Sequence, residues 1–136
     1  MPICQDELIN QIVEFLLNKM PVDLIIIFGS FTQNRLKKDS DIDIAFLSDK
    51  VISSYECFMI GQELADILGR DVDLVNLQKA STVFKAQIVE YGKAIYFSSE
   101  TILRNFQMNA LKEYCKLNEE RAVILQKINE RGYVYG

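Results

Sequence analysis

The spacing of hydrophobic positions changes along the chain, and each change predicts a helix or a strand. Residues 7–17 carry apolar side chains at helical spacing, and Pro21 ends this segment. Residues 23–28 form a short apolar run, typical of a strand that is buried on both faces. The chain is therefore expected to begin with a helix that leads into a central strand.

Residues 41–47 alternate with a period of two, which predicts a second strand with two different faces. One face carries the apolar side chains, Ile42, Ile44 and Phe46. Asp41 and Asp43 consequently share the opposite face of this strand.

The same alternation of elements continues through the middle of the chain. A helical stripe of apolar residues ends at Gly69, a glycine suited to a C-terminal cap. Residues 71–77 predict a third strand. Ser81 can cap a helix that Gly92 closes, and residues 93–97 form a short fourth strand.

The last segment predicts a long helix, which Ser98 or Ser99 caps and which runs towards Arg131, with Gly132 as its end. Some thirty residues would span roughly 45 Å at 1.5 Å per residue. A compact domain of this size has a radius of gyration of only about 14 Å. One straight helix could not bury its full length on its own domain, so two arrangements of this helix stay open. Either it breaks near Asn118, or its far end packs on another chain, a second copy or a partner.

The composition fits an ordinary globular protein, with 49% hydrophobic and 25% charged residues among 136. The longest apolar run is too short to cross a bilayer, and no secretory signal precedes the first helix. Three widely spaced cysteines suggest neither a disulfide framework nor a cysteine metal site. We expect a cytoplasmic protein without membrane contact, and one α/β domain over residues 1–136 with helices packed on a small sheet.

The absence of histidine limits the chemistry that this chain can perform. It excludes Ser-His-Asp and Cys-His nucleophilic sites, and also a histidine-ligated zinc site. The net charge of −4 gives no general attraction to nucleic acid. Catalysis would have to use carboxylates, hydroxyls, lysines or metal ions.

A Gly-Ser pair follows the central strand directly, at Gly29 and Ser30. Glycine permits a sharp turn and a close approach of ligand to backbone, and the Ser30 hydroxyl with free N–H groups would seat phosphate oxygens. Ten residues later Asp41 and Asp43 present two carboxylates. These would repel a triphosphate unless divalent cations intervened, and two Mg²⁺ ions about 4 Å apart would satisfy both groups. The pattern indicates a metal–nucleotide site.

Other nucleotide and metal motifs do not fit this stretch. Asp39, Asp41 and Asp43 mimic the start of an EF-hand loop, but Ile44 and Lys50 stand where that loop needs glycine and glutamate. The chain contains neither a P-loop nor a dinucleotide-binding glycine motif.

A third carboxylate should complete the site, and the third strand offers Asp71 and Asp73. Both point to one face of that strand, so the alternation cannot choose between them.

The chain resembles the DNA polymerase β-like nucleotidyltransferases, and within them the MntA-type minimal nucleotidyltransferases, over essentially its whole length. The resemblance rests on Gly29-Ser30, ten residues and Asp41-x-Asp43, then on Val72-Asp73-Leu74-Val75-x-Leu77, Phe84-x-x-x-Ile88 and Gly92-x-x-Ile95-Tyr96. It implies a small mixed sheet flanked by helices, with a long C-terminal helical segment. It also implies that Asp41 and Asp43 hold both metals and that Asp73, rather than Asp71, binds the catalytic metal and helps to deprotonate the attacking hydroxyl.

The resemblance further implies an antitoxin that uses ATP and Mg²⁺ to transfer AMP to a tyrosine of a HEPN-domain ribonuclease toxin encoded beside it. Two other functions stay open: inhibition of the toxin by binding alone, and transfer to a small-molecule hydroxyl such as that of an aminoglycoside. The family usually reads Gly-Ser-x-Ala-Arg-Gly, whereas this chain has Gln33 and Asn34 at the last two positions. Asn34 tolerates a left-handed backbone, but Gln33 lacks the positive charge of arginine.

Overall fold

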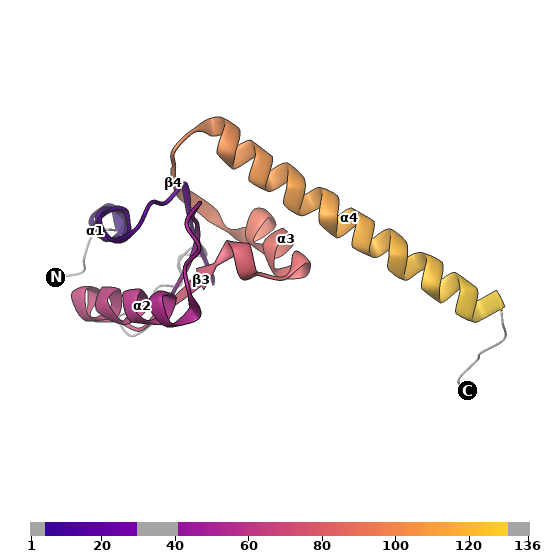
Figure 1. Cartoon of the computed structure of the whole chain (residues 1–136), viewed down its shortest axis with the longest axis horizontal. Helices are drawn as coiled ribbons and strands as arrows, with labels where there is room; N and C mark the ends of the chain where they lie inside the picture. Colours follow the sequence, from indigo (N-terminus) through magenta and orange to yellow (C-terminus); the bar gives the residue numbers. More distant parts are fainter. Residues whose placement is uncertain (1–4, 30–40, 131–136) are drawn as a thin grey trace.

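The computed structural model describes residues 5–29 and 41–130 of the chain (Figure 1). Helices and strands alternate as the hydrophobic spacing predicts. In chain order the elements are α1 (Gln5–Lys19), β1 (Leu24–Phe28), β2 (Ile42–Leu47), α2 (Ser54–Leu68), β3 (Val72–Asn76), the 3₁₀ turn η2 (Leu77–Lys79), α3 (Thr82–Tyr91), β4 (Lys93–Phe97) and α4 (Glu100–Glu130).

The four strands form one mixed sheet in the order β3-β2-β1-β4. β1 pairs antiparallel with both β2 and β4, whereas β2 and β3 run parallel. β1 and β2 are therefore the inner strands, and β3 and β4 are the edges. The expected fold, a small mixed sheet with flanking helices and a long C-terminal helix, is confirmed.

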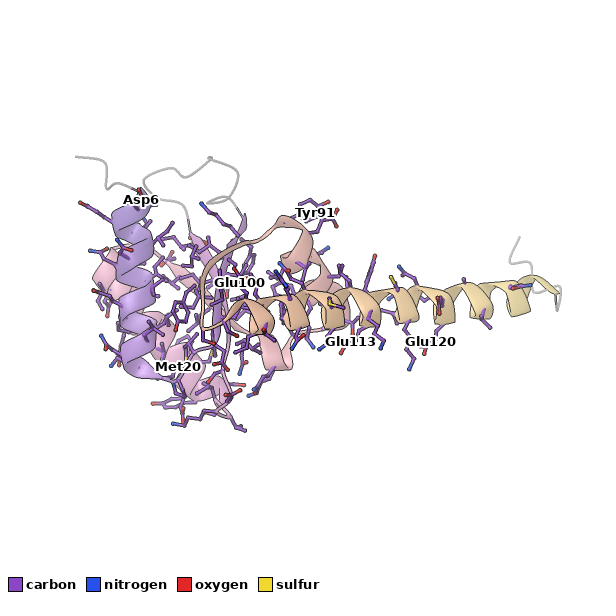
Figure 2. The ribbon with its side chains drawn as sticks, turned by 90° about the horizontal axis from the view of Figure 1, so that it is seen from above. Asp6, Met20, Tyr91, Glu100, Glu113 and Glu120 are labelled. Atoms are coloured by element: carbon purple, nitrogen blue, oxygen red, sulfur yellow. The ribbon has the colours of Figure 1, made fainter. Side chains whose placement is uncertain are left out.

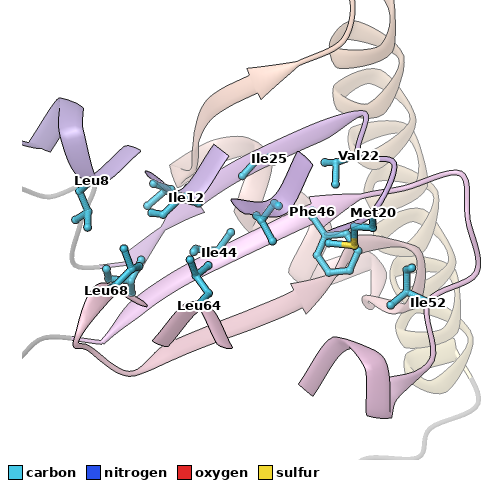
Figure 3. Packing of buried hydrophobic residues seen from close by; sticks show 13 residues of the cluster. Leu8, Ile12, Met20, Val22, Ile25, Ile44, Phe46, Ile52, Leu64 and Leu68 are labelled. Atoms are coloured by element: carbon cyan, nitrogen blue, oxygen red, sulfur yellow. The ribbon is translucent and has the colours of Figure 1, made fainter. Parts of the chain in front are cut away.

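Helices α1 and α2 cover one face of the sheet, and the larger hydrophobic core lies between them and the strands (Figure 3). Ile42, Ile44 and Phe46 of β2 point into this core and are fully buried, as the period-two pattern predicts. Ile25 and Ile27 of β1 join them from the neighbouring strand.

Helices α3 and α4 cover the opposite face with a second, smaller core. Leu24 and Ile26 of β1 point into it, so β1 is buried on both faces, as expected for the apolar run. Ala45 of β2 faces this side, and so does Asp43 two residues earlier in the strand.

Most helix caps in the structure are the residues that the sequence predicts. Ser81 accepts a hydrogen bond from the Phe84 N–H at 3.1 Å, and Ser99, not Ser98, accepts the corresponding bond in α4 from Ile102 at 3.2 Å. Gly69 ends α2 in the left-handed conformation, with φ of 66°.

Gly92 closes its helix as predicted, but without the left-handed conformation of Gly69. Its φ is −82°, which any residue can adopt. A Cβ at this position would lie 2.5 Å from the Ile88 carbonyl oxygen and 2.6 Å from Cγ2 of Ile26. Glycine is required here because a side chain would clash both with the last turn of α3 and with Ile26 of β1.

Helix α4 is continuous over 31 residues, so the version with a break near Asn118 is wrong. Its first turns pack on α3 and the sheet through Leu103, Phe106 and the buried Ala110. Beyond this contact the helix projects away from the body of the molecule (Figures 1 and 2). In residues 5–29 and 41–130 no helix is long and apolar enough to span a membrane.

Candidate active site

The turn at the end of β1 brings its backbone against a carboxylate of β2. Gly29 follows Phe28 with φ of 76°, in the left-handed region that favours glycine. Phe28 is the register partner of Asp43 in the antiparallel pair. A Cβ at Gly29 would lie 2.3 Å from Asp43 Oδ2 and 3.3 Å from its Cγ, closer than any ordinary contact. The missing side chain therefore leaves the space that the Asp43 carboxylate occupies.

The parallel pairing of β2 with β3 sets two aspartates side by side. Asp43 is the register partner of Asp73, and adjacent strands lie only about 4.8 Å apart. The Asp43 side chain is half-buried, and that of Asp73 is exposed. Asp71 lies two residues earlier, before β3 begins, and its carbonyl accepts a hydrogen bond from the Ile42 N–H at 2.9 Å. The sheet thus makes Asp73, rather than Asp71, the neighbour of Asp43.

The surroundings of Asp43 raise the energetic cost of its negative charge. Burial raises the pKa of Asp43, and the charges of Asp73 and then Asp41 raise it further. Both neighbouring carboxylates therefore act on Asp43, although Asp41 lies just before β2 and is exposed. A bound cation would remove this repulsion, and carboxylate oxygens are the hard ligands that Mg²⁺ prefers.

The protein groups that the structure describes do not enclose a metal ion by themselves. Within the two described stretches, no three or more Cys, Asp and Glu side chains are placed so that they could hold one by themselves. Mg²⁺ in nucleotide sites commonly takes one or two carboxylates and completes its shell with water and phosphate oxygens. The donor set here fits a metal that binds together with a nucleotide, and the ligand roles of Asp41, Asp43 and Asp73 stay predictions.

The predicted phosphate seat is only partly visible. Gly29 adopts the turn that the sequence suggests, but Ser30, Gln33 and Asn34 lie outside the described residues. The roles given to these three side chains stay predictions.

An aromatic contact braces the same turn on the face of the sheet that also carries Asp43. The rings of Phe28 and Phe84 meet edge to face, with centroids 5.5 Å apart and planes at 86°. This contact ties α3 to the last residue of β1, next to Gly29. The sequence analysis placed Phe84 in the helix between Ser81 and Gly92 and in the family resemblance, but did not indicate that it supports the site.

A groove of about 490 Å³ adjoins Asp73, and the sequence did not predict it. It lies between α2, β3 and the η2 segment, and its lining includes Cys57 and Lys79. Burial raises the pKa of the Cys57 thiol, while the charge of Lys79 lowers it and that of Asp73 raises it. The thiol donates a hydrogen bond to the Leu74 carbonyl at 3.4 Å. These residues are far apart in the sequence, so only the pairing of α2 with β3 reveals them as one surface.

Comparison with known proteins gives a consistent result. The family model for polymerase β nucleotidyltransferases matches residues 10–101. The chain is 34% identical over 120 residues to the protein adenylyltransferase MntA of Shewanella oneidensis, a match that covers 88% of this chain and 86% of the relative. It is 31% identical over 84 residues to a putative protein adenylyltransferase of Methanocaldococcus jannaschii, covering 62% and 89% of the two chains.

Solved structures give the same relationship in three dimensions. A chain in the crystal structure of a toxin–antitoxin pair with AMP-PNP superposes with a TM-score of 0.80 at 34% identity, covering 88% of this chain and 97% of the other. A chain in the complex of a tri-AMPylated Shewanella oneidensis HEPN toxin with an MNT antitoxin gives 0.78 at 32% identity, covering 92% and 98%. Together with the family match and the relationship to MntA, these similarities confirm the resemblance, and the chain belongs to the polymerase β nucleotidyltransferase family.

Proposed function

We propose that this chain is an ATP- and Mg²⁺-dependent adenylyltransferase that acts as an antitoxin by transferring AMP to a tyrosine of a HEPN-domain toxin. The observation that carries the proposal is the pair Asp43 and Asp73, set side by side next to the Gly29 turn. The related MntA is a protein adenylyltransferase, and similar chains occur with AMP-PNP and with an AMPylated HEPN toxin.

In the proposed reaction the tyrosine oxygen forms a bond to the α-phosphorus of ATP. The bond from that phosphorus to the β-phosphate oxygen breaks, and pyrophosphate leaves. Asp73 is the exposed member of the pair and is suited to receive the hydroxyl proton, whereas the half-buried Asp43 is fixed in orientation by its strand and by the turn. Two Mg²⁺ ions, held by Asp41, Asp43 and Asp73 together with the phosphates, would neutralise charge on the attacking and leaving oxygens.

The far half of α4 is the surface that we propose for docking of the toxin. Ala110 is the last described side chain of this helix that is buried. Beyond it, Val123 is a large apolar side chain with 48% of its surface exposed. The partner of this surface is proposed to be the toxin rather than a second copy, because the structural relatives are toxin–antitoxin complexes. An ATP-dependent reaction between two such proteins belongs in the cytoplasm.

The test uses ATP labelled at its α-phosphate, MgCl₂ and the HEPN-domain protein encoded beside this chain. The label should appear on a toxin tyrosine, and Asp43→Asn should abolish its transfer. If the toxin is inhibited equally by the wild type and by Asp43→Asn, and no label is transferred, the chain is an antitoxin that acts by binding alone. Labelling of aminoglycosides in preference to the toxin would instead establish small-molecule transfer.

A further inference from the structure

The groove beside Asp73 follows the outer edge of the sheet. Its lining contains residues from both faces of β3, since Leu74 packs towards α1 and α2 whereas Asp73 and Val75 lie on the other face. Phe58 and Gly61 of α2 form its far wall. A Cβ at Gly61 would only just touch Leu74, at 3.4 Å, so helix and strand approach closely along the floor.

The backbone of β3 is oriented towards this groove at every second residue. The Ile42 N–H donates to the Asp71 carbonyl, so the peptide groups of Asp71, Asp73 and Val75 point to β2. Those of the intervening residues point outward, and the Leu74 carbonyl indeed accepts the Cys57 thiol from that side. A thiol is a weak donor, which a peptide N–H can replace. β3 is thus an edge strand able to accept another strand.

We propose that this groove binds an extended segment of the acceptor protein, which pairs with the edge of β3 and presents its tyrosine hydroxyl to Asp73. The inference rests on the proposed adenylyltransfer, because that reaction requires the acceptor hydroxyl to reach this carboxylate. Addition of a strand to an exposed sheet edge is a common mode of peptide recognition, in which the backbone gives affinity and side-chain pockets give specificity.

Two side chains of the groove define the chemistry of the segment. Phe58 has 62% of its surface exposed and offers an aromatic wall for an apolar or aromatic residue beside the tyrosine. Lys79 is exposed on the same groove and, with Asp73, lies within electrostatic range of Cys57. It favours a segment with an acidic residue near the acceptor tyrosine, and neither side chain belongs to the proposed metal–nucleotide site.

Steady-state transfer to the HEPN-domain protein encoded beside this chain tests the groove. Phe58→Ala and Lys79→Glu should each raise the KM for the acceptor at least about tenfold, while kcat and the KM for ATP change less than about twofold. Tyr55→Ala is the matched control on α2, because Tyr55 is 72% exposed but lies outside the groove. Lys93→Glu makes the same charge change on β4, at the opposite edge. An acceptor KM no higher than in these controls, or an equal rise in the KM for ATP, would overturn the proposal.

A second measurement reads docking without catalysis. The photoreactive residue p-benzoylphenylalanine, in place of Phe58, should crosslink the partner protein in the absence of nucleotide, at the segment that carries the acceptor tyrosine. The same residue in place of Tyr55 should not. If crosslinking occurs only from position 58 but the wild type transfers no AMP, the docking role of the groove is supported and the proposed adenylyltransfer is refuted. If transfer is normal and crosslinking from the two positions is equal or absent, the docking role of the groove is refuted while the proposed adenylyltransfer is supported.

Discussion

Replacement of Gly29 by alanine should damage catalysis far more than folding, because two separate costs meet at this residue. The left-handed backbone, with φ of 76°, costs about 1–3 kcal/mol for a residue with a side chain. The new Cβ would also lie 2.3 Å from Asp43 Oδ2, whereas ordinary contacts begin near 3.4 Å. The carboxylate must therefore move by about 1 Å, and a misplacement of this size can cost about 100-fold in rate.

Gly69→Ala is the control that separates these two costs. Gly69 has nearly the same backbone conformation, with φ of 66°, but a Cβ there would meet no atom within 4 Å. Chemical denaturation should give a similar loss of stability, about 1–3 kcal/mol, for both variants. Labelled-AMP transfer should fall about 100-fold for Gly29→Ala alone. If both variants transfer AMP at the same rate, Gly29 is an ordinary turn residue and the close approach of Asp43 has no catalytic meaning.

Three further substitutions test the site and the long helix. Asp43→Asn should abolish transfer, yet at neutral pH the metal-free variant should unfold at the same temperature as the metal-free wild type or at a higher one. The reason is that burial and neighbouring carboxylates raise the pKa of Asp43 and so disfavour its charged form in the folded chain. A lower thermal unfolding midpoint would contradict this electrostatic account. Asp73→Asn should reduce the rate of AMP transfer at least about 100-fold in single-turnover measurements, whereas Asp71→Asn should change it only a few-fold. The reverse order would mean that the register partner of Asp43 is not the third metal ligand. Truncation after Leu117 removes no described side chain that is buried, so the shortened protein should still be folded by circular dichroism. It should no longer bind the toxin in size-exclusion chromatography. Unchanged binding would refute the docking role of α4.

The sequence predicted the individual elements well, because each has a local signal. The period-two pattern of β2 correctly separated Ile44 from Asp43, and Ser81 and Gly69 act as the caps that their residue types suggest. These properties depend on hydrogen bonds and burial within a few residues. The motif linking Gly29 with Asp43 could be recognised for the same reason, although the order of the strands was unknown.

Properties that depend on strand order could not be read from the chain. Alternation gives Asp71 and Asp73 the same face; the family resemblance implied Asp73, and the parallel register gives the physical reason, since it sets Asp73 beside Asp43. The continuity of α4 is a similar case, since an apolar stripe can continue through a straight helix or across a break. Gly92 shows both kinds of cause, because a side chain there would clash with the nearby Ile88 carbonyl and also with Ile26, which lies far away in the sequence.

The arrangement of the sheet explains how the proposed site can combine a part that is held firmly with a part that is open to the acceptor protein. Asp43 lies on an inner strand whose alternate residues, Ile42 and Ile44, are fully buried in the larger core. This packing holds the strand, and with it the backbone from which the Asp43 side chain extends. Asp73 lies on the edge strand, where one side is held by β2 and the other is open to the groove. The proposed site must hold a nucleotide firmly and also admit part of another protein, and the pairing of an inner strand with an edge strand meets both needs.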